Sequence, residues 1–155
     1  TKTGEVQVMS AGTGIVHSEY NRTKDPLTFY QIWIETNKHN VEPRWESKKI
    51  PTEQASKLTL LASGYSDDKG KALFINQEAR IFGGKLAKGT IVEHNITHQA
   101  YVLASNGMFK LESSTGSKTS NVTMCEGDGA EVTRANSIIL RATTDCEIII
   151  IDTID

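Results

Sequence analysis

Long apolar runs are missing from this chain, and so is an excess of basic residues. No stretch approaches the roughly 18 apolar residues that a membrane-spanning helix needs, so we expect no membrane span. The 17 Lys and Arg and the 19 Asp and Glu leave a net charge of −2, whereas a nucleic-acid-binding domain usually carries a basic face. The sequence therefore gives no support to a membrane or nucleic-acid partner.

Cysteine is also scarce. The two cysteines, Cys125 and Cys146, are too few for the disulfide framework of a small secreted domain. We interpret both as thiols in a reducing compartment, which predicts a cytoplasmic protein. The chain opens at Thr1 within an alternating pattern and shows no signal peptide. We therefore expect a trimmed product or a partial reading frame.

β-Branched residues are abundant: Thr, Ile and Val make up 40 of the 155 residues. These side chains are stiff and pack well on a pleated sheet. Most of the 12 glycines fall between apolar runs, where turns belong. The composition therefore predicts a mostly β protein of one ordinary domain or two very small ones.

The hydrophobic pattern predicts strands at both ends of a linker. Residues 5–10, 15–20 and 27–36 have strand patterns, and the last is apolar on both faces, which is typical of a central strand. Residues 37–51 have no period and contain two prolines, so we interpret them as a linker. Closely spaced strands with Gly, Asn and Asp turns then predict a sandwich or barrel over residues 52–155. Only residues 51–63 have some helical character.

His17 and Glu19 are the first candidate site residues. If they lie on a strand, residues i and i+2 share a face, and their backbones are about 6–7 Å apart. Imidazole and carboxylate together suit iron, manganese, copper, nickel or zinc. From this short pattern alone, a half-buried histidine beside a surface glutamate is the better interpretation.

The surroundings of this pair resemble the pirin-like family of bicupins. The segment GEVQVMSAGTGIVHSEYN, from Gly4 to Asn21, matches that family nearly residue by residue, as does the strand from Pro26 to Ile34. Pro43 and Trp45 fit its E-P-x-aromatic segment. More loosely, residues 75–89 and 125–152 resemble the C-terminal cupin of the quercetinase-like branch.

The resemblance implies an all-β cupin fold, a double-stranded β-helix or jelly-roll barrel. One complete C-terminal cupin would occupy residues 52–155. Residues 1–36 would be the closing strands of a truncated N-terminal cupin, and residues 37–51 the linker. The exposed strands of such a remnant would recruit other strands, so we expect a homodimer.

The resemblance also implies a metal site. In this family the N-terminal barrel binds one metal through three histidines and one glutamate. His17 would be a neutral imidazole ligand, and Glu19 a carboxylate ligand and the candidate catalytic base. The other two histidines come from an H-x-H stretch that this sequence lacks. We therefore expect a divalent transition metal, iron first among the candidates, to be absent from this chain or weakly bound.

The remaining histidines do not complete the site. His39 lies in the expected linker. His94 and His98 would be about 13 Å apart on a strand, too far for one ion. A helix would bring them together, but the β-branched Ile96 and Thr97 between them favour a strand. We therefore expect a second barrel without metal, in which both histidines belong to the core or the rim.

Two functions remain open. The first is a fragment of a metal-dependent quercetin 2,3-dioxygenase-like bicupin, inactive by itself, whose intact form would act on a flavonol-like substrate. The alternative is a non-catalytic binding or regulatory cupin module with no bound metal.

Overall fold

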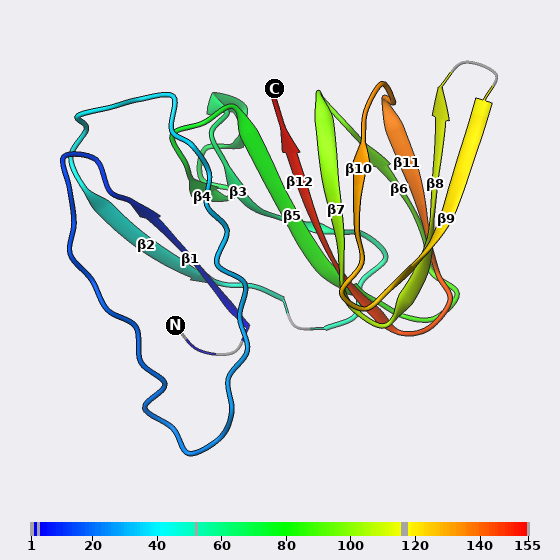
Figure 1. Cartoon of the computed structure of the whole chain (residues 1–155), viewed down its shortest axis with the longest axis horizontal. Helices are drawn as coiled ribbons and strands as arrows, with labels where there is room; N and C mark the ends of the chain where they lie inside the picture. Colours follow the sequence, from blue (N-terminus) through cyan, green and yellow to red (C-terminus); the bar gives the residue numbers. More distant parts are fainter. Residues whose placement is uncertain (1, 3, 52, 116–117, 155) are drawn as a thin grey trace.

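The chain folds into β-strands. The computed structural model describes residues 2, 4–51, 53–115 and 118–154. Within these ranges the only helical element is the short 3₁₀ turn η1 (Ser66–Asp68). Figure 1 shows a two-stranded hairpin beside two larger sheets that face each other. The mostly β composition expected from the sequence is confirmed, and residues 53–63 contain no helix.

The two larger sheets form the barrel expected for the second half of the chain. The six-stranded sheet has the order β10 (Gly129–Val132), β7 (Gln99–Asn106), β12 (Cys146–Thr153), β5 (Ala79–Leu86), β3 (Thr59–Ser63) and β4 (Leu73–Phe74). The four-stranded sheet has the order β6 (Ile91–Asn95), β11 (Ser137–Ala142), β8 (Met108–Thr115) and β9 (Lys118–Cys125). This is a jelly-roll arrangement, in which two sheets bury a common interior.

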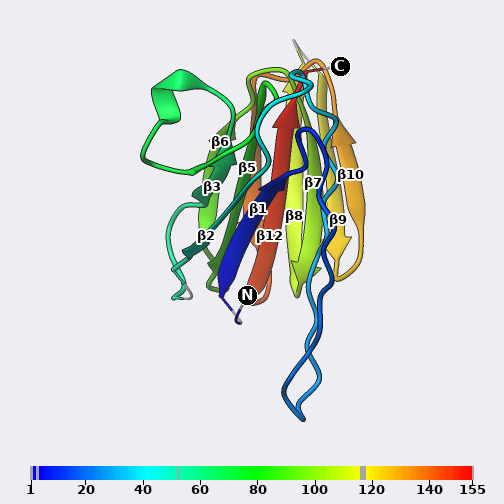
Figure 2. The same cartoon turned by 90° about the vertical axis from the view of Figure 1, so that its left-hand side faces the viewer.

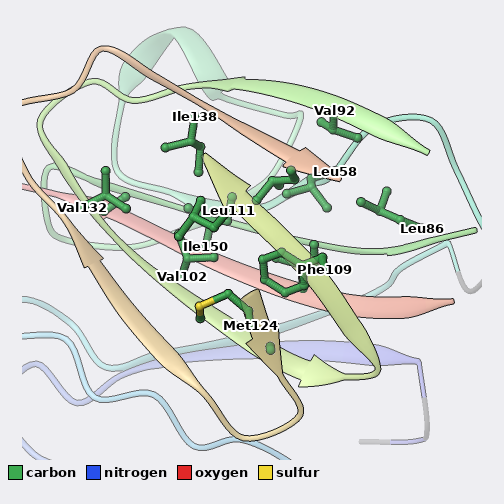
Figure 3. Close-up of a cluster of buried hydrophobic side chains, with 14 of the residues drawn as sticks. Leu58, Leu86, Val92, Val102, Phe109, Leu111, Met124, Val132, Ile138 and Ile150 are labelled. Atoms are coloured by element: carbon green, nitrogen blue, oxygen red, sulfur yellow. The ribbon is translucent and has the colours of Figure 1, made fainter. Parts of the chain in front are cut away.

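The main hydrophobic core lies between these sheets (Figure 3). Phe109 on β8 and Ile150 on β12 are fully inaccessible to solvent. Both sheets contribute alternate side chains, as antiparallel strands with one inward face do. Other members of this core are Leu86, Val92, Val102, Leu111, Met124, Val132, Ile138 and Leu140.

The central position of strand β12 explains its run of four isoleucines. It pairs with β5 on one side and β7 on the other, so it is a central strand. Ile148 and Ile150 point into the barrel core, whereas Ile149 and Ile151 belong to a second cluster. A strand buried on both faces loses the alternation of apolar and polar residues.

The second cluster, which we call the outer cluster, joins the N-terminal hairpin to the barrel. The hairpin consists of β1 (Glu5–Ser10) and β2 (Arg44–Lys49), paired antiparallel. It lies over the outer face of the six-stranded sheet (Figure 2). Val6 and Val8 of β1 pack there together with Ile50 against buried members of the sheet. Those members are Leu61, Ala62, Leu73, Ile75, Ala79 and Ile81.

Strand β2 corrects the linker expected over residues 37–51. The two prolines that indicated an irregular segment, Pro43 and Pro51, flank the strand instead of interrupting it. A proline immediately before a strand or just beyond its end removes no ladder hydrogen bond.

The strands expected at residues 15–20 and 27–36 are absent from the structure. This stretch is fully described, has no regular secondary structure, and is exposed except for the half-buried Ile34. A strand needs a neighbour for its backbone groups, and the described part of the chain places none beside these residues. Among the described residues no surface covers the apolar side chains of this stretch other than Ile34.

Candidate functional site

The candidate site lies on the long segment that connects β1 to β2, residues 11–43. Figure 1 shows this segment leaving the end of β1 as an extended loop and returning to β2. It begins with a tight turn in which Thr13 N donates to Val41 O at 3.0 Å. Gly12 has a φ of +55°, and a Cβ there would lie 2.1 Å from Val41 O. Only glycine fits this turn.

The other end of the segment is fixed to the barrel by three hydrogen bonds. The Gln77 side-chain amide donates to Glu35 O at 2.9 Å. Asn37 N and Thr36 Oγ1 both donate to Asn76 O, at 2.8 and 3.0 Å. The segment is therefore held at both ends, and its middle, which carries the candidate ligands, is open to solvent.

His17 and Glu19 are both exposed in this segment. They do not lie on a strand, so the shared strand face expected from the sequence is not formed. Glu19 Oε1 accepts a hydrogen bond of 2.7 Å from Gln7 Nε2 on β1. The amide oxygen of Gln7 in turn accepts from Trp45 Nε1 on β2, at 3.4 Å. Because Val6 and Val8 face the barrel, Gln7 lies on the opposite face of the hairpin.

Gln7 and Trp45 were not singled out from the sequence as site residues. The alternation of residues 5–10 predicted that Gln7 lies on the polar face of its strand. The contact between Gln7 and Glu19 depends on the pairing of β1 with β2. This pairing brings Trp45 beside Gln7, and Trp45 binds the Gln7 amide oxygen. The expected linker gave no signal of that pairing.

The described residues include ligand types that suit a divalent transition metal, but too few ligands for a complete site. The His17 imidazole and the free Oε2 of Glu19 are suitable donors. Metal sites usually hold three or four protein ligands. Within the described ranges, no three His, Cys, Asp or Glu side chains are grouped so that they could hold a metal ion. The pair therefore supplies half of a ligand set.

The barrel contains one buried histidine, His94 on β6. Its ring packs edge-on against Phe82, with centroids 4.5 Å apart. Desolvation lowers the pKa of His94 below its ordinary value of 6.5, although the Asp152 carboxylate partly opposes this shift. Nε2 is buried and has no hydrogen-bond partner among the described atoms. Of the core and rim positions expected for this histidine, the structure gives the buried one.

His98 lies outside that core, on the rim of the barrel. Its Nε2 is 3.0 Å from the hydroxyl of Tyr65. It follows the end of β6, so it shares no strand with His94. Asp152, only 2% exposed, accepts hydrogen bonds from Thr97 N at 2.7 Å and His98 N at 3.1 Å. The turn between β6 and β7 is thus fixed by a buried carboxylate, and it separates the two histidines.

Asp152 was not singled out from the sequence. The signal available was a carboxylate that ends an apolar run in a strand apolar on both faces. A wide cleft of about 570 Å³ opens beside His98, lined also by Gln99, Thr133, Arg134 and Ile154. None of these lining residues lies on the segment that carries His17 and Glu19.

Two family models match separate parts of the chain. The quercetinase C-terminal cupin domain matches residues 60–153, which is more than half of the chain. The pirin model matches residues 1–34, which include both candidate ligands. The chain belongs to the quercetinase-like branch of the pirin family.

Individual pirin-family proteins are similar to this chain over almost its whole length. A protein of Zymomonas mobilis, provisionally named a quercetin 2,3-dioxygenase, is 39% identical over 153 residues, which are 97% of this chain and 61% of that protein. The quercetin 2,3-dioxygenase of Escherichia coli K12 is 30% identical over 151 residues, 96% of this chain and 61% of that enzyme. This chain therefore spans about three fifths of the length of the curated relatives it matches.

Solved structures confirm the cupin fold. The crystal structure of YhhW from Escherichia coli superimposes with a TM-score of 0.82 at 26% identity, covering 99% of this chain and 62% of YhhW. A second YhhW structure, a complex with nickel(II), gives a TM-score of 0.80 at 26% identity, covering 97% of this chain and 61% of that one. The family therefore includes a protein that binds a divalent transition metal.

Proposed function

We propose that this pirin-family chain is part of a metal-dependent dioxygenase that acts on a flavonol such as quercetin. The observation that carries the proposal is the exposed His17–Glu19 pair inside the pirin-matched region. The names of its relatives support the substrate class. No helix in the described ranges is long and apolar enough to cross a membrane. Its two free thiols and the absence of a disulfide framework favour the cytoplasm.

In this proposal His17 and Glu19 provide two ligands of a divalent metal, with iron and nickel as the first candidates. Such a metal, when bound, supplies a Lewis acid that holds the flavonol oxygens. His17 binds as a neutral imidazole. Glu19 has Oε1 fixed by Gln7, so Oε2 is the atom that either ligates the metal or accepts the hydroxyl proton of the flavonol. The remaining ligand positions are filled from outside residues 1–155 or by water.

Because two protein ligands are fewer than a stable site needs, we infer that residues 1–155 alone turn over quercetin weakly at most. The function is therefore tested in a chimera in which these residues replace the corresponding region of the Escherichia coli relative. The metal-loaded chimera should consume oxygen and bleach the flavonol absorption of quercetin.

The site assignment is tested in the same chimera. His17→Ala and Glu19→Gln should each lower turnover by at least the roughly 10- to 100-fold that loss of a supporting residue costs a metal site. The matched controls His39→Ala and Glu42→Gln change exposed residues of the same segment and should leave turnover unchanged. A folded, metal-loaded chimera without turnover would refute the proposed function.

The alternative function is a binding or regulatory cupin module without a metal. It is favoured by one observation: within the described ranges no three His, Cys, Asp or Glu side chains are grouped so that they could hold a metal ion. If the chimera folds and does not oxygenate quercetin, this alternative becomes the better explanation.

A further inference from the structure

We propose that the cleft beside His98 binds a small organic acid, whose carboxylate is held by Arg134 and His98 and whose apolar body contacts Ile154. The cleft has a volume of about 570 Å³, which falls within the range of about 300–1,000 Å³ that small-molecule sites have. The proposed site shares no residue with the candidate metal ligands His17 and Glu19, so it does not rest on the proposed function.

Three parts of the barrel meet at the cleft: the turn from β6 to β7, the turn from β10 to β11, and the end of β12. Figure 1 shows the end of β12, marked C, at the same end of the barrel as the turn from β10 to β11. Val132 of β10 pairs with Ala100 of β7. Ile96 N donates to Asn136 O at 2.8 Å, which joins the two turns. The walls are therefore formed before a ligand arrives, which lowers the cost of binding.

Arg134 has an unfavourable backbone conformation. Its φ is +60°, in the left-handed region, which is costly for a residue with a Cβ and less so for glycine or asparagine. The other described non-glycine residue with a positive φ is Asn40. An arginine thus takes a position that suits a smaller residue, and it lines the cleft. Residues held in such conformations cluster at ligand sites, so this turn indicates one.

Tyr65 orients the His98 imidazole. The Tyr65 hydroxyl is 3.0 Å from His98 Nε2, so Nδ1 is the ring nitrogen left for a ligand. Burial raises the pKa of Tyr65 above its ordinary value of 10.0, although the charge of Arg80 opposes this shift. The hydroxyl therefore keeps its proton at neutral pH and can donate it to Nε2. A neutral imidazole that accepts at Nε2 carries its proton on Nδ1, where it can donate to a carboxylate.

Arg80 holds Tyr65 in turn. The Arg80 guanidinium carbon lies 4.1 Å from the centroid of the Tyr65 ring. The same guanidinium donates to Asp68 Oδ2 at 2.7 Å and to Thr97 Oγ1 at 3.1 Å. Tyr65 and Arg80 are therefore positioning residues, which fix the His98 ring through contacts outside the cleft.

The lining of the cleft selects a carboxylate with an apolar body. The Arg134 guanidinium is a planar fork that matches the two oxygens of a carboxylate. Gln99 and Thr133 add polar side chains, and Ile154 offers an apolar contact. Among the described lining residues none is Asp or Glu. Inorganic phosphate would meet the same cation but would leave Ile154 without an apolar partner.

The first test titrates benzoate into the chelator-treated chain and follows the backbone amide signals by NMR. We expect saturable shifts at the lining residues. Benzamide, which has nearly the same shape without the charge, and inorganic phosphate should each bind at least about 10-fold more weakly. Absence of saturable shifts, or equal binding of benzamide, would overturn the proposal. Equal binding of phosphate would overturn the choice of an organic acid.

The second test assigns the residues. Arg134→Met and His98→Ala should each weaken benzoate binding by about 10-fold or more, because each removes a donor to the carboxylate. Tyr65→Phe should weaken it less than His98→Ala does. The matched controls Arg22→Met and His39→Ala change exposed residues outside the cleft and should bind as the wild type does. Unchanged binding in Arg134→Met or His98→Ala would overturn the site.

Stability separates a ligand-binding role of Arg134 from a structural one. Arg134→Asn introduces a residue that tolerates a positive φ. This variant should lose benzoate binding and keep or raise the urea midpoint of unfolding. A lower midpoint would show that Arg134 supports the fold, and it would overturn the argument from its backbone.

The last test asks whether the cleft binds in a complete bicupin. The chimera with the Escherichia coli relative should bind benzoate as tightly as residues 1–155 do. Loss of binding in the folded chimera would overturn the site. Quercetin turnover by the chimera depends on His17 and Glu19, whereas benzoate binding depends on Arg134 and His98. Failure of one proposal is therefore distinguishable from failure of the other.

Discussion

The side-chain amide of Gln7 donates a hydrogen bond of 2.7 Å to Oε1 of Glu19. Through this contact the hairpin reaches a candidate ligand in an otherwise open segment. Because Trp45 Nε1 donates to the Gln7 amide oxygen, the amide nitrogen is directed toward the carboxylate. The hairpin thereby restricts Glu19 without burying it.

We predict that Gln7→Leu makes the segment of residues 11–43 more mobile. The free energy of unfolding should change by less than about 1 kcal/mol, because the lost hydrogen bond is solvent-exposed. Trypsin cleavage after Arg22 and Lys24 should become faster than in the wild type. Gln31→Leu, an exposed glutamine of the same segment, is the control. Equal cleavage rates for Gln7→Leu and wild type would show that the contact does not order the segment.

The buried His94 should make the stability of the barrel depend on pH. Burial lowers the pKa of this imidazole below 6.5, despite the opposing charge of Asp152. Below pH 6.5 the unfolded state therefore binds the proton first, and stability falls until the pH passes the lower pKa of the folded state. Urea unfolding of His94→Leu should lack this loss between pH 7 and pH 5, whereas the exposed-site control His39→Leu should retain it. A His94→Leu profile parallel to that of wild type would contradict the assignment.

The ion pair between Arg80 and Asp68 should matter more than the pair between Arg141 and Glu112. Arg80 Nε donates to Asp68 Oδ2 at 2.7 Å, and the two side chains are 22% and 13% exposed. We expect Arg80→Met to cost about 2 kcal/mol of unfolding free energy, because it leaves a half-buried carboxylate without its cation. Arg141→Met, in a pair whose side chains are 40% and 26% exposed, should cost only about 0.5 kcal/mol. Denaturant unfolding of both variants measures the difference, and a larger cost for Arg141→Met would contradict the argument.

The ion pair between Arg80 and Asp68 also predicts a loss of stability at a more acidic pH. Burial by itself would raise the pKa of Asp68, but hydrogen bonds from Ser63 and Arg80 outweigh it and leave the pKa below its ordinary value of 3.8. Stability from this carboxylate is therefore present above pH 3.8 and is lost as the pH falls through the folded-state pKa. Ser63→Ala should shift that loss to higher pH in an acid titration followed by circular dichroism. An unchanged midpoint would contradict the role of Ser63.

The two cysteines should differ in reactivity. Burial, with a smaller contribution from the charge of Asp145, raises the pKa of Cys146 to about 11, so it holds little thiolate at neutral pH. Cys125 is exposed. A thiol reagent should therefore label one site in the folded protein and two after denaturation, with Cys125→Ser leaving none in the folded state. Rapid labelling of folded Cys125→Ser would refute the prediction.

The barrel could be predicted from the sequence because most of its strands carry a local signal. Apolar runs, β-branched residues, and glycine and asparagine turns all act locally. The run from Ile148 to Ile151 belongs to a strand, β12, that is covered on both faces. What the sequence did not indicate was which surface covers the outer face, because that depends on β2 pairing with β1.

The segment of residues 15–36 shows the limit of local patterns. The apolar residues around Phe29 and Trp33 have the pattern of a central strand, yet these two side chains are 64% and 86% exposed. Strand formation requires a partner as well as a pattern. The residues of the candidate site were found from a motif, but their geometry depends on Gln7, and through it on pairing between distant strands.

The outer cluster packs together two parts of the chain that separate family models match. The pirin model ends at residue 34 and the quercetinase C-terminal cupin model begins at residue 60, so the two models divide the chain into a first and a second module. Packing joins them again, because Val6 and Val8 from the first module pack against the same buried cluster as Ile149 and Ile151 from the second. A gene fusion that moved the second module alone would carry an uncovered apolar sheet into its new host. Such a transfer would succeed only where the recipient protein offers a replacement for the hairpin.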